Sequence, residues 1–254
     1  MSEIVRDPVV SGMFYPADRD ELRRMVEGFL AAVPARDGPS PKAIVAPHAG
    51  YVYSGSIAAH AYACVQPDSI RRVVLLGPAH RVWLEGVGAS SASAWRTPLG
   101  DVPVEAPPGL PILDAAHAEE HSLEVQLPFL QVVLNDFTLI PLVVGHASKE
   151  EISDILDSLW GGDETLIVIS SDLSHYEDYE TANRMDSAAS QAIVNLDPNG
   201  LDAENACGRV PICGLLHLAK QKGMRAKLID LRNSGDTAGS RDQVVGYGAY
   251  AFYE

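Results

Sequence analysis

Short, unbroken apolar runs alternate with segments of helical periodicity along most of the chain. Continuous apolar runs of four to six residues are typical of strands that are covered on both faces, as in a mainly parallel sheet. We predict such strands at residues 43–46, 73–76, 139–144, 165–170 and 226–231. Apolar residues alternate with other residues at 243–253, which predicts one further strand late in the chain.

Helical periodicity lies between these runs. The segment 20–33 carries an apolar stripe, with acidic residues in its first turn, where the helix dipole favours them. We predict further helices at 54–65, 151–160, 212–219 and 123–134, the last interrupted at Pro128, and a hairpin excursion within 86–105. Only residues 34–41 resemble a linker. The alternation predicts an α/β fold: a single domain over 1–254, with a mixed, mainly parallel central sheet flanked by helices.

The amino-acid composition limits the classes of partner that this protein is expected to bind. The 254 residues include 34 acidic and 19 basic side chains, for a formal charge of −15, which disfavours nucleic acid and anionic lipid as partners. No run approaches the roughly 20 apolar residues of a membrane helix, and the first residues are charged, so we expect a cytoplasmic protein. Cys64, Cys207 and Cys213 lack CxxC spacing and are interpreted as small buried hydrophobes.

Polar, chemically active residues follow each of the five strand-like runs. They are His48, His80, His146, the pair Asp172 and His175, and the pair Ser234 and Asp236. Because ligands of open α/β sheets bind outside the carboxyl ends of parallel strands, we expect these residues to gather at one edge. A single histidine after a strand is more typical of a structural residue, so the hypothesis depends on their convergence.

Two histidines and one carboxylate are the ligand set of non-haem Fe(II) sites, and His48, His80 and Asp236 can supply it. The turn from Gly77 to His80 lacks the GxxxxGK[ST] spacing and the lysine of a phosphate loop, so we expect no nucleotide. The GxSxG turn of serine hydrolases is also absent from the sequence.

Further residues are candidates for the walls of such a site. His121 and Glu124 are three residues apart on a predicted helix, which places them on one face, where they can orient a ligand or move a proton. A surface or capping pair is the alternative. Tyr51 and Tyr53 can line a pocket for a flat substrate, although aromatic residues more often belong to a core or a rim.

Seven blocks of sequence, in order from about residue 8 to 253, resemble the Memo-like family, whose bacterial and archaeal members are called AmmeMemoRadiSam system protein B. The blocks are VSGMFYP at 10–16, PHAGYVYSG at 47–55, LGPAH at 76–80, EHSLEVQLPFL at 120–130, SSDLSHY at 170–176, NSGDT at 233–237 and VGYGA at 245–249.

The resemblance implies a fold like that of the class III extradiol (LigB-type) dioxygenases, which open catechol rings with Fe(II) and O₂. It implies that His48 and His80 are metal ligands and that His175 is an additional active-site histidine. Asp236 or Thr237 lies where the third ligand is expected; this chain has Thr237 where animal Memo proteins have a cysteine and the dioxygenases a glutamate. The expected metal is Fe(II), with Cu or Zn as alternatives.

The leading hypothesis is therefore a metal-binding oxidoreductase-type protein, or the remnant of a dioxygenase-like enzyme. A second hypothesis is a metal-free hydrolase or lyase that uses the same pocket for acid–base chemistry. A third is a non-catalytic partner or scaffold, acting with the AMMECR-type and radical-SAM proteins that the family name implies.

Overall fold

Most of the chain packs around one twisted sheet. A computed structural model describes residues 4–35, 38–202 and 204–254, and within these ranges the main sheet has eight strands. Seven of them follow the order β10 (Arg225–Asn233), β11 (Val244–Tyr253), β2 (Ala43–Ala46), β8 (Thr165–Ser170), β3 (Arg72–Pro78), β7 (Thr138–Val144) and β4 (Val87–Ala89). The eighth, β9 (His175–Glu177), pairs with β11. The α/β class and the mixed sheet predicted from the apolar runs are confirmed.

The strand directions place the chemically active residues together. The four central strands β2, β8, β3 and β7 are mutually parallel. β11 runs antiparallel to both β2 and β10, so β10 points the same way as the central four. Five strands therefore end at one edge of the sheet. β8 lies between β2 and β3 although it follows both in the chain, which brings the segment after Ser170 between His48 and His80.

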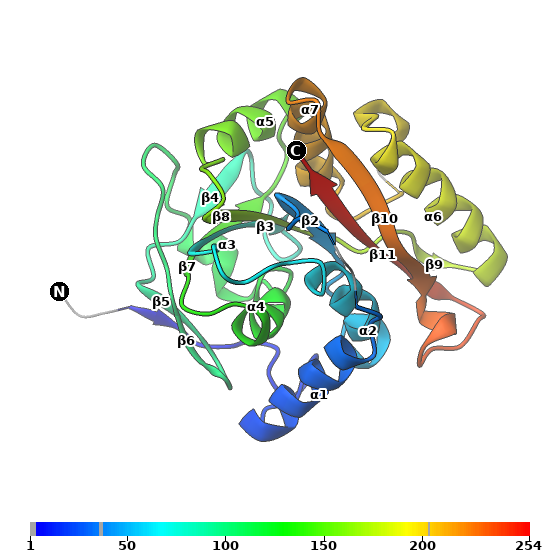
Figure 1. Ribbon diagram of the computed structural model, residues 1–254, viewed down its shortest axis with the longest axis horizontal. Helices are drawn as coiled ribbons and strands as arrows, with labels where there is room; N and C mark the ends of the chain where they lie inside the picture. The colour runs from blue at the N-terminus through cyan, green and yellow to red at the C-terminus, as the bar shows by residue number, and fades with distance from the viewer. Residues whose placement is uncertain (1–3, 36–37, 203) are drawn as a thin grey trace.

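Helices cover both faces of the sheet (Figure 1). One face carries α1 (Arg19–Ala31), α2 (Tyr51–Tyr62) and α4 (Leu127–Val133), and the other carries α5 (Lys149–Ser158), α6 (Tyr179–Val194) and α7 (Arg209–Gln221). Successive residues of each strand alternate between the two apolar cores: in β2, Ile44 belongs to the core on the side of α1, α2 and α4, whereas Val45 belongs to the core on the side of α5, α6 and α7. This two-sided burial explains why the strands are apolar without alternation.

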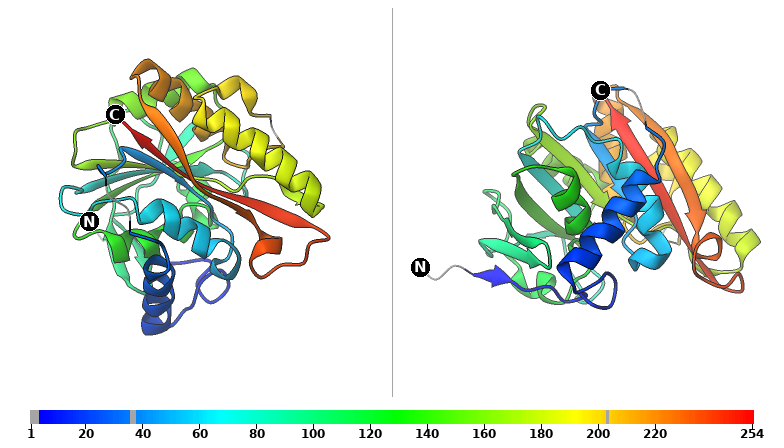
Figure 2. Two further views of the ribbon diagram at one scale, coloured as in Figure 1. Left: turned by 45° about the vertical axis from the view of Figure 1, so that its right-hand side comes forward. Right: turned by 60° about the horizontal axis from the view of Figure 1, so that its bottom comes forward.

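The predicted hairpin is present as β5 (Ala94–Thr97) and β6 (Gly100–Pro103), to which the short β1 (Val5–Arg6) adds in parallel. The figures show this small sheet beside the main one, on the side where the chain begins (Figure 2). Along the chain, β6 is followed by α3 (Asp114–Ala118) and the 3₁₀ turn η1 (Glu124–Gln126), which leads into α4 with Pro128 in its first turn. Pro128 thus restarts the helix, as the sequence predicts.

The helix α6, of 16 residues, is not among the helices predicted from the sequence. Its buried face consists mainly of alanine and small polar residues, which weakens the periodic apolar signal. Among the described residues, no helix is long and apolar enough to cross a membrane.

Candidate metal centre

His48 lies two residues after the end of β2 and is 2% exposed. Its Nδ1 atom lies 2.9 Å from the Ser170 hydroxyl, at the end of the neighbouring strand β8. Its backbone N–H donates to the Asp172 carboxylate at 2.7 Å. Its second ring nitrogen, Nε2, lies 3.4 Å from the sulfur of Cys207. The ring is therefore held at Nδ1 and presents Nε2 to the thiol.

His80 follows β3 and is held by Glu120, a carboxylate that is only 1% exposed. The His80 Nδ1 atom lies 2.9 Å from one Glu120 oxygen, and the His80 backbone N–H donates to the other at 2.5 Å. The backbone N–H groups of His121 and Ser122 also donate to Glu120, each at 2.8 Å. A carboxylate at Nδ1 leaves Nε2 as the free nitrogen, the arrangement usual for histidines that bind metals.

Cys207 comes from the loop before α7, 159 residues from His48 in the sequence. Its sulfur accepts the Asp172 backbone N–H at 3.3 Å, and the Gly208 N–H donates to the Ser171 hydroxyl at 2.9 Å. A Cβ atom at Gly208 would lie 2.8 Å from the Ser170 carbonyl oxygen, so the close approach of this loop to β8 requires glycine.

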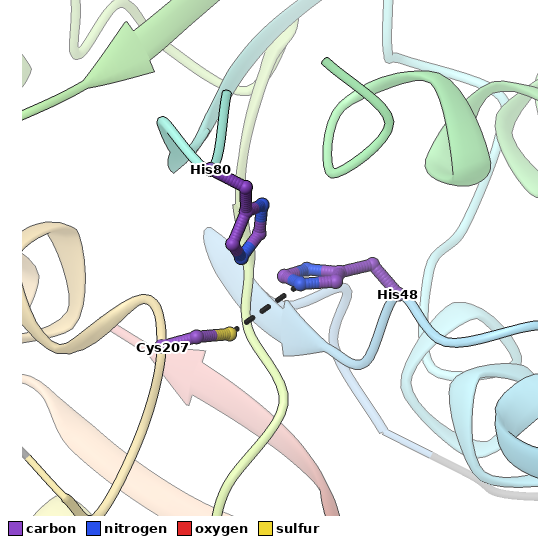
Figure 3. A group of neighbouring side chains, drawn as sticks. All are labelled: His48, His80 and Cys207. Atoms are coloured by element: carbon purple, nitrogen blue, oxygen red, sulfur yellow. Dashed lines mark hydrogen bonds between the residues drawn. The ribbon is translucent and has the colours of Figure 1, made fainter. Parts of the chain in front are cut away.

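Ligand atoms of His48, His80 and Cys207 all lie within 4.8 Å of one another. The two rings and the sulfur converge on a common point (Figure 3). Two imidazole nitrogens and a sulfur are a donor set suited to Zn, Cu or Fe rather than to Mg or Ca, which prefer oxygen ligands. The residues present therefore fit a transition-metal ion.

Burial controls the protonation of this cluster. Burial, together with the proximity of His80, lowers the pKa of His48 to about 3, and burial with the proximity of His48 lowers the pKa of His121 to about 4. Both rings are neutral near pH 7, and for His48 this is the form that can bind a metal. Burial alone would raise the pKa of Glu120, but the hydrogen bonds from His80 and from backbone N–H groups lower it to about 2.

The metal-free thiol is protonated at neutral pH. Burial, and then the negative charge of Asp172, raise the pKa of Cys207 to about 12. An activated cysteine nucleophile shows the opposite shift, so this geometry does not support a cysteine-dependent hydrolase.

A cleft of about 730 Å³ opens in front of the two histidines. Its lining includes His48, His80, His121, Asp172, His175, Ser234 and Tyr53, all of which the sequence analysis placed at the site, together with Met13, Phe14, Arg81, Tyr176, Gln243 and Tyr247. The rings of His48, His80 and His121 form a triangle with centroid separations of 4.8 to 5.5 Å. The structure therefore brings together most of the expected site.

Asp236 and Thr237 are not brought to His48 and His80. The Asp236 carboxylate accepts the Tyr179 hydroxyl at 2.6 Å and the Asn233 backbone N–H at 3.1 Å, and so stabilises the turn η3 (Ser234–Asp236). The Thr237 hydroxyl donates to the Ser234 carbonyl at 3.2 Å. Both side chains are engaged in the turn after β10, and the residue that lies with His48 and His80 is Cys207.

Three other candidates lie outside the cleft. Glu124 is fully buried in an ion pair with Arg6 and does not line the cleft. Tyr51 belongs to the core, where its hydroxyl donates to the Val125 carbonyl at 2.7 Å. His146 stacks with Trp83 in a separate pocket of about 250 Å³ that Cys207 also lines.

Neither Cys207 nor Glu120 is among the site residues predicted from the sequence. Glu120 lies in the quoted block EHSLE, but helical spacing drew attention to His121 and Glu124 instead. Cys207 has no local motif, and its only signal is that a cysteine in a glycine-containing loop before a helix is less typical of a core residue.

The fold and the cluster define an α/β protein with a His₂Cys group at the carboxyl edge of its sheet. Comparison with known proteins gives the family. The model of the Memo-like protein family matches residues 6–251. Relatives named MEMO1 family protein include those of Methanosarcina mazei (39% identical, 96% of this chain and 98% of the relative), Aquifex aeolicus (37%, 96% and 97%) and Desulfurococcus amylolyticus (36%, 98% and 99%). The chain belongs to the Memo-like family.

Proposed function

We propose that this protein binds one transition-metal ion through His48 Nε2, His80 Nε2 and Cys207 Sγ, and uses it for oxidoreductase-type chemistry on a small molecule in the cleft. The observation that carries the proposal is the convergence of three donor atoms within 4.8 Å. Two further observations support it: each imidazole is held at Nδ1 by another side chain, and both histidines line the large cleft.

The choice of metal follows from the ligands. Fe(II), Cu and Zn are the candidates, because imidazole suits all three, and a thiolate further strengthens binding of Cu(I) and Zn. The expected carboxylate ligand is replaced by sulfur, so the site departs from the two-histidine, one-carboxylate pattern of the extradiol dioxygenases.

The bound metal supplies Lewis acidity, and electron transfer if it is Fe or Cu. Side chains around the cleft supply the groups that bind the small molecule and accept its proton. His121 is neutral and forms one wall of the cleft beside both ligands, and Arg81 offers a cation to an anionic group of the ligand. His175, exposed at the mouth, accepts a proton from the bound molecule.

A second candidate function is that of a partner protein. Large apolar side chains are exposed beside the cluster: Trp83 is 83% exposed, Met13 72% and Tyr176 70%. Such residues are enriched in protein interfaces. A complex, for example with AMMECR-type or radical-SAM proteins, that survives replacement of both histidines would favour this function.

Metal content tests the proposal. The protein is purified anaerobically, reconstituted with Fe(II), Zn(II) or Cu(I), desalted and subjected to elemental analysis. We expect about one ion per chain in the parent and none in His48→Ala/His80→Ala. Unchanged metal content in that folded double variant would contradict the proposal.

Two cysteine variants make the test sharper. Cys207→Ser removes the sulfur ligand, whereas Cys213→Ser alters a buried cysteine in α7 that contacts the Pro198 carbonyl. With Co(II) as a probe, thiolate-to-cobalt charge-transfer absorption should appear in the parent and in Cys213→Ser and be absent from Cys207→Ser. The same absorption in all three proteins would exclude Cys207 as a ligand.

A further inference from the structure

A buried chain of hydrogen bonds lies behind His48, away from the cleft. It consists of Ser170, Ser122 and Gln126, all fully buried, with Tyr62 at its far end. Within the described part of the chain, none of these four lines the cleft or belongs to a candidate metal-binding group.

The orientation of the Gln126 amide is determined by its neighbours. Its Nε2 lies 3.0 Å from the Pro47 carbonyl oxygen, which can only accept a hydrogen bond. The NH₂ group must therefore point that way. Its oxygen faces Tyr62, whose hydroxyl donates to it at 2.8 Å. The same NH₂ group lies 2.8 Å from the Ser170 hydroxyl and donates its other hydrogen there.

Ser170 has one hydroxyl proton and three polar neighbours. The Ser122 carbonyl, at 2.6 Å, can only accept, and the Gln126 NH₂ can only donate. The proton of Ser170 is therefore used on Ser122. The remaining neighbour, His48 Nδ1 at 2.9 Å, must then donate to the Ser170 oxygen.

We propose that Ser170 is a positioning residue that holds His48 in the tautomer protonated at Nδ1, so that the lone pair of Nε2 faces Cys207 and the metal position. The tautomer follows from the buried hydrogen bonds alone; its consequence for metal affinity rests on the proposed function.

The two imidazoles are thus oriented by different means. His80 donates to a carboxylate, which orients the ring and also strengthens it as a ligand through its charge. His48 donates to a neutral hydroxyl, which sets the tautomer without placing a charge at Nδ1. Loss of the Ser170 hydroxyl removes the acceptor at Nδ1 and with it the preference for this tautomer.

The tautomer of His48 can be measured directly in metal-free protein. Multiple-bond ¹H–¹⁵N spectra of the ¹⁵N-labelled full chain at pH 7 distinguish protonated from unprotonated ring nitrogens, and His48→Gln assigns the His48 signals. We expect a protonated Nδ1 and an unprotonated Nε2 in the parent. Ser170→Ala should shift His48 toward the Nε2-protonated form and weaken Zn(II) binding about 10- to 100-fold.

Two variants separate positioning from a general loss of packing. Ser170→Thr keeps the hydroxyl and should restore both the tautomer and the affinity. Ser190→Ala removes another buried serine, which contacts Tyr250 elsewhere in the fold, and should alter neither.

An Nε2-protonated His48 in the parent would overturn the proposal, whether or not any variant folds. An unchanged tautomer and unchanged affinity in Ser170→Ala would also overturn it. Failure of the parent to bind metal would instead overturn the proposed function and leave the tautomer assignment standing.

Discussion

Two carboxylates four residues apart, Glu120 and Glu124, are both almost completely buried, yet they serve different regions of the molecule. Glu120 accepts hydrogen bonds from His80 and from the backbone N–H groups of His121 and Ser122. Glu124 accepts from partners more than 100 residues away in the N-terminal segment: the Arg6 guanidinium, the Val9 and Val10 backbone N–H groups and the Tyr15 hydroxyl.

The difference shows that burial of a charge does not by itself mark an active site. Glu124 ties the segment after β1 to the body of the protein, with a cation as one partner. Glu120 holds a ring whose free nitrogen faces the cluster. The role of each carboxylate depends on which part of the chain donates hydrogen bonds to it: the His80 segment in the case of Glu120 and the N-terminal segment in the case of Glu124.

The largest expected effect is on stability at Glu124. Glu124→Gln leaves Arg6, which is 8% exposed in its side chain, without its counter-charge, and breaking a buried pair costs about 3–5 kcal/mol. Urea unfolding should show this loss, while folded protein should keep the metal affinity of the parent. A large loss of metal affinity in the folded variant would place Glu124 with the site after all.

Glu120→Gln should show the opposite pattern, with its main effect on metal affinity and not on stability. Removing the charge at His80 Nδ1 should weaken Zn(II) binding about 10- to 100-fold, because partners behind a metal ligand typically contribute that much. Competition with a chelator measures it, with Glu124→Gln as the matched control. Equal affinities in the two variants would remove the distinction between the two carboxylates.

The stability contributed by the region around Arg6 should also depend on pH. Burial lowers the pKa of His117, whose backbone carbonyl accepts from Arg6, to about 4. Because the unfolded chain binds this proton near pH 6.5, the free energy of unfolding should fall by about 2 kcal/mol from this residue alone between pH 7 and pH 5. His117→Gln should reduce that slope in denaturant titrations. An identical slope in parent and variant would show that His117 does not titrate in this window.

The smallest effect concerns the turn after β10. Asp236→Ala and Thr237→Ala should change Zn(II) affinity less than about twofold, because both side chains bond within the turn and neither belongs to the cluster. Loss of the bond from Tyr179 to Asp236 should cost about 1 kcal/mol of stability. A tenfold loss of affinity in either variant would restore the ligand predicted from the sequence.

Much of the fold could be predicted because it depends on regular features. Strands buried on both faces must be apolar throughout, and residues after parallel strands must emerge at one edge, so His48 and His80 were identified from their positions alone. The helix α6 could not be identified in this way, because an alanine-rich face has little apolar contrast.

The sequence by itself thus determined the class of the fold, the family and the two histidines, since each follows from local patterns or from contiguous motifs. Only the tertiary structure decided which way Glu124 and Asp236 point and that Cys207 joins the cluster. Those outcomes depend on side-chain directions in turns and on a contact between segments 159 residues apart, which no local pattern encodes.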